Sequence, residues 1–436
     1  MDSPVQMSTA IRNALIVTQD RSRRVLRGDI LIEEDRIQAI GDVREDADIE
    51  IDAKGDIVIP GLVNAHTHVS MSIMKGIADD LPFSDFLDRV FAIDGKRTSE
   101  DIAAGTRLGL MEMIAGGTTT FVDLYYSQEI IAHEVESAGI RGVLCWAVLD
   151  EQFTTQEGVP IDNCRRFYHD FAESELVYPG VGPQGVYVCS DETLLKASDF
   201  ALEKNIPLTF HLSETRGEVY DYKEKVGKRP VEHLHDIGFL SENCLAAHSA
   251  WLTLREVRLL AENGVSVATC PVSNMKLATG GVAPIPEMLD AGVNVSLGTD
   301  GSTTNNSLDM FGEMKMLALL QKSNRWDATV LPAQKVLDAA TIDGARAIGL
   351  GDQTGSIELG KKADLVILDG KAPNLNPIRM DKLASTLVYS ASCLNVKTVL
   401  CNGRTIYLDR EFMTLDEGKV LSDANDACDD LLGRTT

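Results

Sequence analysis

The chain has 436 residues, of which 44% are hydrophobic and 25% are charged, a balance typical of a globular protein rather than a disordered or fibrous one. Its formal net charge of −25 argues against a nucleic-acid partner, because binding to phosphates requires a basic surface. As one domain, a chain of this length would need an α/β barrel or a similarly large fold.

The sequence contains no sign of export or of a membrane partner. Residues 1–7 lack a basic stretch followed by an apolar one, so we expect no signal peptide. No apolar run approaches the ~20 residues needed to cross a bilayer. Eight cysteines are spread singly, and none forms a Cys-x-x-Cys pair, which favours a reduced, cytoplasmic protein.

Both ends of the chain have the alternating pattern of short β-strands. Such strands are predicted at residues 14–17, 28–32, 36–41, 363–368 and 396–404. Because the two ends look alike and flank a different middle, we predict one small β-sandwich built from both. This gives an amino-terminal part at 1–60, a middle domain at 61–355 and a carboxyl-terminal part at 356–436.

The middle domain alternates apolar strands with amphipathic helices, the pattern of parallel βαβ units. A first strand ends at Ala65, and seven more are predicted at 118–123, 142–147, 177–182, 206–211, 244–248, 265–269 and 293–299. Helical stretches lie between them, among them 99–115, 190–204 and 254–263. Eight such units predict a (β/α)8 TIM-type barrel with an active site at the carboxyl ends of the strands. A last helix, about 416–432, is expected to pack on the barrel exterior through its apolar face.

The tripeptide His66-Thr67-His68, at the end of the first barrel strand, is the strongest functional signal. Residues two apart on a strand point to the same face, so both imidazoles can bind one metal ion. A second His-x-His, His233 and His235, lies in a segment with helical periodicity, where residues two apart diverge by roughly 200°. We therefore predict a metal site at the first pair and none at the second.

Other polar residues also follow the predicted strands. His211 would complete a set of three imidazoles that leaves room for water, as in catalytic zinc sites, and Asp300 would be the fourth ligand. Asp300 could also take a proton from the attacking water. Glu214 would shuttle protons beside the metal, and His248 would hydrogen-bond the attacking hydroxide. Residues 181–187 contain no lysine that could bridge two ions, so one metal ion is favoured.

These motifs resemble those of the amidohydrolase superfamily, and within it the methylthioadenosine/S-adenosylhomocysteine deaminases. The resemblance covers nearly the whole chain and is carried by residues 60–68, 75–82, 211–215, 273–277, 298–301, 305–310 and 360–365. It implies a barrel with a composite β-sandwich and one divalent metal ion, usually zinc, with iron or manganese as alternatives. It also implies hydrolytic loss of ammonia from a heteroaromatic ring, and assembly into a homo-oligomer.

Carried onto this chain, the resemblance assigns the metal ligands as His66, His68, His211 and Asp300. Glu214 would protonate a ring nitrogen, while His248 and Asp300 would act on the hydroxide. A small-molecule substrate and water are the implied partners. The implied substrate is an adenine nucleoside such as methylthioadenosine, S-adenosylhomocysteine or 5′-deoxyadenosine.

The positions that hold the sugar in nucleoside-deaminating relatives differ in this chain. Where those relatives have a glutamate, an arginine and a histidine, this chain has Asp94, Trp146 and Gln184. With Glu214, these residues are the candidates for substrate binding, although for Trp146 a place in the core is favoured over stacking on an aromatic base. The differences leave a second possibility open, namely a free base, a pterin or an s-triazine that loses an amino or chloro group. A third possibility is a barrel that binds without catalysis.

Overall fold

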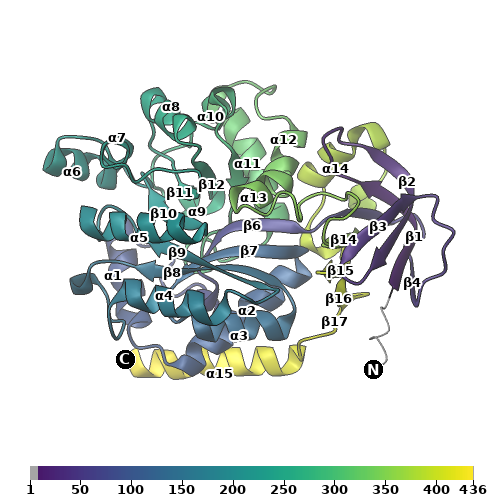
Figure 1. The fold of residues 1–436 in the computed structure, drawn as a ribbon, viewed down its shortest axis with the longest axis horizontal. Coiled ribbons are helices and arrows are strands. Elements are labelled where there is room, and N and C mark those ends of the chain that lie inside the picture. The colour runs from purple at the N-terminus through teal and green to yellow at the C-terminus, as the bar shows by residue number, and fades with distance from the viewer. Residues whose placement is uncertain (1–7, 436) are drawn as a thin grey trace.

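The computed structural model describes residues 8–435, which form a barrel and a flanking sheet that lie side by side (Figure 1). The barrel is a ring of eight strands surrounded by helices. The flanking sheet has nine strands and takes them from both ends of the chain. The predicted fold class is therefore confirmed.

The barrel strands follow one another in chain order, each parallel to its neighbour. They are β6 (Leu62–Thr67), β7 (Thr118–Tyr125), β8 (Arg141–Val148), β9 (Val177–Pro183), β10 (Leu208–Leu212), β11 (Cys244–His248), β12 (Ser266–Thr269) and β13 (Val295–Leu297). The backbone N–H of Asp300, just beyond β13, donates to the carbonyl of His66 at 2.9 Å, which brings the last strand against the first. All predicted barrel strands are present.

Helices cover the outside of the barrel, and their capping residues explain where they begin. Thr98 precedes α2 (Ser99–Ala115), and its hydroxyl accepts a hydrogen bond from the backbone N–H of Asp101. The backbone N–H of Thr98 donates in turn to the carboxylate of Asp101, which completes a capping box. Ser190 caps α5 (Asp191–Lys204) through the backbone N–H of Thr193. The other helices up to the end of the barrel are α1 (Phe83–Asp94), α3 (Gln128–Ala138), α4 (Pro160–Phe171), α6 (Arg216–Val226), α7 (Pro230–Asp236), α8 (Leu254–Glu262), α9 (Pro271–Lys276), α10 (Ile285–Ala291), α11 (Met310–Arg325), α12 (Ala333–Ala339) and α13 (Ile342–Ala347).

The composite sheet joins strands from opposite ends of the chain. Its order is β17-β16-β15-β14-β5-β1-β2-β3, with β4 paired to β1. The amino-terminal strands are β1 (Ser8–Val17), β2 (Val25–Glu33), β3 (Arg36–Gly41), β4 (Ile49–Asp52) and β5 (Ile57–Pro60). The carboxyl-terminal strands are β14 (Leu365–Leu368), β15 (Val396–Cys401), β16 (Arg404–Leu408) and β17 (Glu411–Phe412). β5 and β14 pair antiparallel at its centre and unite the two ends.

One predicted strand proves to be two. The segment 396–404 breaks at Asn402 and Gly403, whose φ angles are 51° and 75°. Two consecutive residues with positive φ form the tight turn that suits a two-residue β-hairpin, and Asn-Gly is a favoured sequence for it. The prediction of one continuous strand was therefore wrong, because the turn dipeptide was not taken into account.

The chain passes from the composite sheet to the barrel through a single residue. β5 ends at Pro60 and β6 begins at Leu62. A side chain on the intervening Gly61 would lie 2.0 Å from the hydroxyl oxygen of Thr119, so only glycine fits there. The predicted domain limits, 60/61 and 355/356, stay predictions.

Two later helices attach the carboxyl-terminal part to the barrel. α14 (Leu383–Tyr389) packs on α11 and α12, and α15 (Glu417–Thr435) packs along α2 at the bottom of Figure 1. The helix predicted at 416–432 is thus confirmed on the barrel exterior. Within residues 8–435, no helix is both long and apolar enough to span a membrane.

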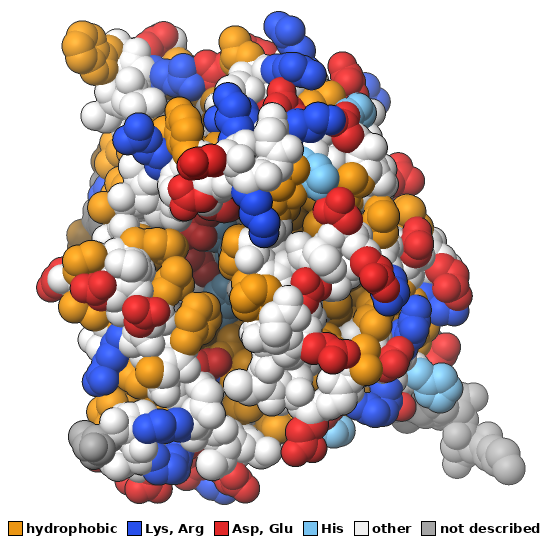
Figure 2. Space-filling view, turned by 90° about the vertical axis from the view of Figure 1, so that its left-hand side faces the viewer, with side chains coloured by type: hydrophobic (Ala, Val, Ile, Leu, Met, Phe, Trp, Pro, Cys, Tyr) orange, Lys and Arg blue, Asp and Glu red, His pale blue; other side chains and the backbone are white. Residues whose placement is uncertain are grey.

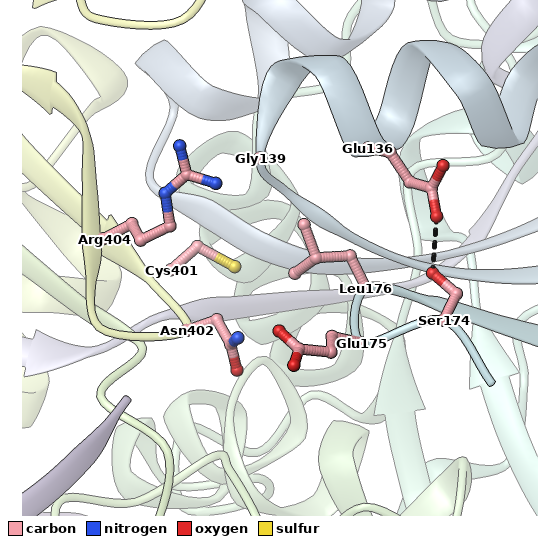
Figure 3. A pocket seen from close by; sticks show the side chains of 8 residues that line it. All are labelled: Glu136, Gly139, Ser174, Glu175, Leu176, Cys401, Asn402 and Arg404. Atoms are coloured by element: carbon pink, nitrogen blue, oxygen red, sulfur yellow. Dashed lines mark hydrogen bonds between the residues drawn. The ribbon is translucent and has the colours of Figure 1, made fainter. Parts of the chain in front are cut away.

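A cavity of about 260 Å³ lies at the amino end of the barrel, next to the composite sheet (Figure 3). Leu176 precedes β9, while Asn402 and Arg404 come from the β15–β16 hairpin. Glu136 accepts a hydrogen bond of 2.7 Å from Ser174 on one wall. This cavity is at the opposite end of the strands from the predicted metal ligands.

Candidate active site

Four imidazoles and one carboxylate meet at the carboxyl ends of the barrel strands. The ring centroid of His66 lies 4.9 Å from that of His68, 5.0 Å from that of His211 and 5.3 Å from that of His248. Oδ1 of Asp300 lies 3.5 Å from Nε2 of His66 and 3.3 Å from Nε2 of His68. The structure therefore brings these five predicted residues together from four strands.

Two of the imidazoles are oriented by backbone carbonyls. Nδ1 of His68 lies 2.7 Å from the carbonyl oxygen of Leu124, and Nδ1 of His211 lies 2.8 Å from that of Gln184. Because a carbonyl only accepts, each Nδ1 carries the proton and each Nε2 keeps its lone pair. The two Nε2 atoms lie 3.3 Å apart and face the centre of the site. Such carbonyl contacts orient histidine ligands of metal ions.

His66 is buried without any hydrogen-bond partner among the described residues. Its side chain is 0% exposed, and neither ring nitrogen makes a hydrogen bond. A buried polar nitrogen without a partner is costly, so its surroundings point to a missing ligand. Burial also lowers the pKa of His66 to about 4 and that of His211 well below its usual value, so both rings are neutral at pH 7. Neutral imidazoles with a carboxylate fit a divalent metal ion.

Asp300 is held in position by its own turn and by a neighbouring helix. Its Oδ2 accepts from the hydroxyl of Ser273 at 2.6 Å, and its Oδ1 accepts from the N–H of Gly301 at 2.7 Å. Burial would raise the pKa of Asp300, but its 3.5 Å contact with the imidazole of His66 and the charges of the neighbouring imidazoles outweigh burial and hold the pKa well below the usual range. The carboxylate is thus ionised and ready to bind a cation.

The strand exits at this site have unusual backbone conformations. His248 and Asp300 have φ angles of 64° and 65°, and Ser213 has 48°. Residues other than glycine rarely adopt such φ angles, and those that do occur preferentially at functional sites. A side chain on Gly298 would lie 2.7 Å from the backbone nitrogen of His66, so glycine is needed for β13 to approach β6.

Glu214 and His248 face each other beside the predicted metal ligands. Oε2 of Glu214 lies 3.9 Å from Nε2 of His248. Burial raises the pKa of Glu214. Burial would lower the pKa of His248, but the charges of Glu214 and Asp300 outweigh it and raise that pKa. Both pKa values are therefore shifted upward, the direction that favours the protonated form of each side chain.

Glu218 supports this loop and was not predicted. Its two carboxylate oxygens accept from the backbone N–H groups of Ser213 at 2.9 Å and Glu214 at 2.8 Å. Burial raises the pKa of Glu218 to about 7. Thr215 caps α6 by accepting from the N–H of Glu218 at 3.0 Å. The Thr-x-x-Glu capping pattern was a signal for the helix start, although not for the contact with the loop.

Asp94, a predicted substrate-binding residue, belongs to a buried polar cluster beside His68. Its carboxylate accepts from the hydroxyl of Tyr125 and, at 3.0 Å, from that of Tyr126. The guanidinium of Arg97, with a fully buried side chain, lies 2.7 Å from the same carboxylate. The ring of Tyr125 lies 6.2 Å from that of His68, which brings Asp94 to the wall of the site. No sequence pattern indicated Arg97 or the two tyrosines.

The other two predicted substrate-binding residues lie in different surroundings. Gln184 follows β9, and its carbonyl contacts His211 at the site itself. The indole of Trp146 is 6% exposed, packs on Phe167 of α4 at 5.8 Å and donates to Gln156 at 2.8 Å. Its ring therefore lies between β8 and α4, and its contact with a substrate stays a prediction.

The histidine pair that was expected to bind no metal lies on helix α7, as predicted. His233 contacts Asp191 at 2.8 Å, whereas Nδ1 of His235 lies 3.1 Å from the amide of Asn263. The two rings thus engage different partners.

Figure 2 views the carboxyl end of the barrel, where a hollow has acidic and histidine side chains at its bottom and hydrophobic side chains around its rim.

Comparison with known proteins identifies the family. Residues 57–406 match the amidohydrolase family. The chain belongs to that family. The family prediction made from the motifs is therefore confirmed.

Relatives of this amidohydrolase match it over nearly their full length. It is 40% identical to a 5′-deoxyadenosine deaminase of Methanosarcina barkeri, over 97% of this chain and 98% of that protein. It is also 40% identical to a 5-methylthioadenosine/S-adenosylhomocysteine deaminase of Pyrococcus furiosus, over 94% and 98%. Among solved structures, an adenosine deaminase from Xanthomonas campestris with bound zinc superposes with a TM-score of 0.94 at 32% identity, over 98% of both chains.

Proposed function

We propose that this amidohydrolase removes ammonia by hydrolysis from an adenine nucleoside of the 5′-deoxyadenosine, methylthioadenosine or S-adenosylhomocysteine type. Water supplies the oxygen that replaces the amino group on the ring, and ammonia leaves. The observation that carries this proposal is the unpartnered, buried His66 among three further imidazoles and Asp300, with Glu214 beside them. The names of the two relatives support the nucleoside substrate.

We assign one divalent metal ion to His66, His68, His211 and Asp300, and zinc as that ion. The predominance of imidazole ligands and the zinc in the Xanthomonas campestris structure support zinc over iron or manganese. When bound, such an ion would lower the pKa of a water molecule to about 7, which makes hydroxide available at neutral pH.

The protein's own side chains handle the protons. We assign Glu214 as the acid that protonates a ring nitrogen, because it lies beside the proposed metal ligands and burial raises its pKa, which favours its protonated form. Asp300 is assigned to take the proton of the attacking water, since its low pKa keeps it ionised. His248, 3.9 Å from Glu214, is assigned to donate a hydrogen bond to the attacking oxygen and so to stabilise its charge.

Substrate contacts are assigned to the wall beside His68 and His211. Oδ2 of Asp94 accepts one hydrogen bond, from the hydroxyl of Tyr126. A carboxylate oxygen can accept a second one, so this atom can also accept a hydrogen bond from a sugar hydroxyl. Gln184 contacts His211 through its backbone and has a partly exposed side chain that can reach a ligand. Trp146 supports this wall through Gln156.

The cellular setting is also a proposal. All eight cysteines are free thiols, and six of them are buried, which supports a reducing compartment such as the cytoplasm. A homo-oligomer stays a prediction, which light scattering on the purified protein tests.

Ammonia release by zinc-loaded protein tests the function. We expect turnover of 5′-deoxyadenosine and methylthioadenosine, and none of adenine, a pterin or an s-triazine. His66→Ala should lose both the metal and the activity, whereas His235→Ala, a histidine of α7 outside the site, should keep both. Turnover confined to free bases, pterins or triazines would show that the substrate is one of these rings and not a nucleoside. Absence of bound metal after loading would support the non-catalytic barrel.

A further inference from the structure

We propose that two buried asparagines, Asn64 and Asn305, are positioning residues that fix Asp300 in the proposed metal site. This inference rests on the proposed function and deepens it, because it names side chains that support one of the assigned ligands. Neither asparagine is itself an assigned ligand or substrate contact. The basis is the set of hydrogen bonds around Thr299, the residue that precedes Asp300.

Asp300 lies where the ring of strands closes. The strand order runs from β13 around the ring to β6, and no strand ladder joins these two strands within residues 8–435. The other neighbours in the ring are held in register by ladders of backbone hydrogen bonds. Because β6 carries His66 and the segment after β13 carries Asp300, the relative position of two assigned ligands depends on how this closure is made.

Asn64 bridges the closure with its side chain. It lies on β6 two residues before His66 and is fully buried. Its Oδ1 accepts from the backbone N–H of Thr299 at 3.0 Å, and its Nδ2 donates to the hydroxyl of Thr299 at 2.8 Å. The carboxamide therefore ties the first barrel strand to the residue before Asp300 by two hydrogen bonds.

Asn305 contacts the other backbone group of Thr299. Its Nδ2 donates to the carbonyl of Thr299 at 2.7 Å and also to the carboxylate of Glu313 on α11. Both hydrogens of the amide are thus used, so α11 fixes the orientation of this side chain. Thr299 lies beyond the end of β13, and the two asparagines pair the backbone groups that a strand neighbour would otherwise pair. A buried N–H or carbonyl left without a partner is costly.

These contacts matter because Asp300 is held in an unfavourable backbone conformation. Its φ is 65°, an angle that residues other than glycine keep only where their surroundings hold them. In this conformation its Oδ1 lies 3.5 Å from Nε2 of His66 and 3.3 Å from that of His68. Removal of either asparagine frees Thr299 to relax and takes the carboxylate of Asp300 away from the imidazoles, which weakens metal binding.

Metal affinity tests this role independently of turnover. In competition with a chelator of known affinity, Asn64→Ala and Asn305→Ala should bind zinc about 10–100-fold more weakly than the native chain. The visible spectrum of the cobalt-loaded protein reports the ligand geometry at the ion, and it should also change in both variants. Unchanged affinity together with an unchanged spectrum would overturn the inference. Absence of metal binding by the native chain would instead overturn the proposed function.

Asn294, just before the amino end of β13, is the matched control. Its amide donates to the hydroxyl of Ser266 at 3.2 Å and to the carbonyl of Asp343 at 3.0 Å, so it also joins neighbouring segments by two hydrogen bonds. Asn294→Ala should lower the free energy of unfolding and leave the zinc affinity and the cobalt spectrum as in the native chain. Equal weakening of zinc binding in this variant would show that a general loss of stability is responsible, and would overturn the inference.

A pair of variants at Thr299 keeps the inference testable if an asparagine variant does not fold. Thr299→Val removes the hydroxyl that accepts from Asn64, whereas Thr299→Ser retains it. Zinc affinity should fall by about 3–10-fold in Thr299→Val, which corresponds to one hydrogen bond, and should stay near the native value in Thr299→Ser. Equal zinc affinities of the two variants would overturn the inference.

Discussion

Both ends of the barrel bury polar side chains, but these side chains differ in whether they have hydrogen-bond partners. At the amino end, Arg141 and Asp364 form an ion pair whose side chains are each 1% exposed. Asp364 also accepts from the backbone of Asn402 at 2.8 Å and from Thr354 at 3.2 Å. At the carboxyl end, His66 is equally buried, and neither of its ring nitrogens has a hydrogen-bond partner within residues 8–435.

This difference separates structural polar groups from functional ones. A buried ion pair with further hydrogen bonds is satisfied by the fold itself, so it fixes how the composite sheet sits on the barrel. A buried imidazole without partners is satisfied only by something that the protein binds. In this barrel the unpartnered imidazole of His66 lies at the functional end, and the paired Arg141 and Asp364 lie at the end where the composite sheet joins it.

The largest expected effect is at the functional end. Glu214→Gln removes the proposed acid while keeping its shape, and should lower kcat by about 10²–10⁴-fold. Metal content and the midpoint of thermal unfolding should change little, because Glu214 is not among the proposed ligands. Steady-state ammonia release and metal analysis measure these quantities. Full activity in this variant would contradict the role of Glu214.

The reverse pattern is expected at the architectural end. Asp364→Asn leaves the guanidinium of Arg141 buried without its counter-charge and should reduce the free energy of unfolding by about 3–5 kcal/mol. Denaturant unfolding measures the loss, and kcat of the remaining folded enzyme should be unchanged. Asp381→Asn, at an exposed ion pair with Arg379, is the control and should have little effect on stability. A large fall in kcat with an unchanged free energy of unfolding would contradict the structural role of Asp364.

A smaller change sharpens the description of the metal site. Ser273→Ala removes the hydrogen bond of 2.6 Å to Asp300 and should weaken metal binding by about 10–100-fold. Competition with a chelator of known affinity measures the change. Unaltered affinity would show that the contact of Asp300 with Gly301 is enough to position the carboxylate.

A further expected effect is a pH dependence of stability at Glu218. Burial raises the pKa of Glu218 to about 7 in the folded protein, whereas in the unfolded chain it titrates near the ordinary glutamate value of about 4.3. Between these pKa values the folded state binds more protons, so the contribution of Glu218 to stability is fully present at low pH and is lost as pH rises toward 7. In urea unfolding, the free energy of unfolding should therefore fall less between pH 5 and pH 8 for Glu218→Gln than for the native chain. An equal fall in the free energy of unfolding of the two proteins would contradict this role of Glu218.

Much of the site was predictable because its residues lie at the carboxyl ends of strands. His66 and His68 share a face by their spacing, and His211, His248 and Asp300 lie at the ends of three other strands in a barrel whose strand ends must meet. The periodic pattern located those strands to within two residues at each end. Local pattern and parallel topology were therefore enough to place these residues near one another.

The supporting residues were not predictable in this way. Ser273 is 27 residues from its partner Asp300, and Tyr125 is 31 residues from Asp94. Tyr125 carries no motif signal, and the segment 273–277, although it resembles the family, did not indicate the contact of Ser273 with Asp300. Both contacts arise where a helix or a strand end packs against a loop. The hairpin at Asn402 and Gly403 differs, because its turn signal was present in the sequence and was not used.

By itself, the sequence determined the barrel, the two-ended sheet, the family and the group of residues that meet at the strand ends. It could do so because strand and helix periodicity and the spacing of metal ligands are properties of short segments. Only the tertiary structure decided which buried polar groups have partners, since hydrogen bonds such as those of Arg141 join residues hundreds of positions apart. The unpartnered His66 and the paired Arg97 therefore became visible only after folding.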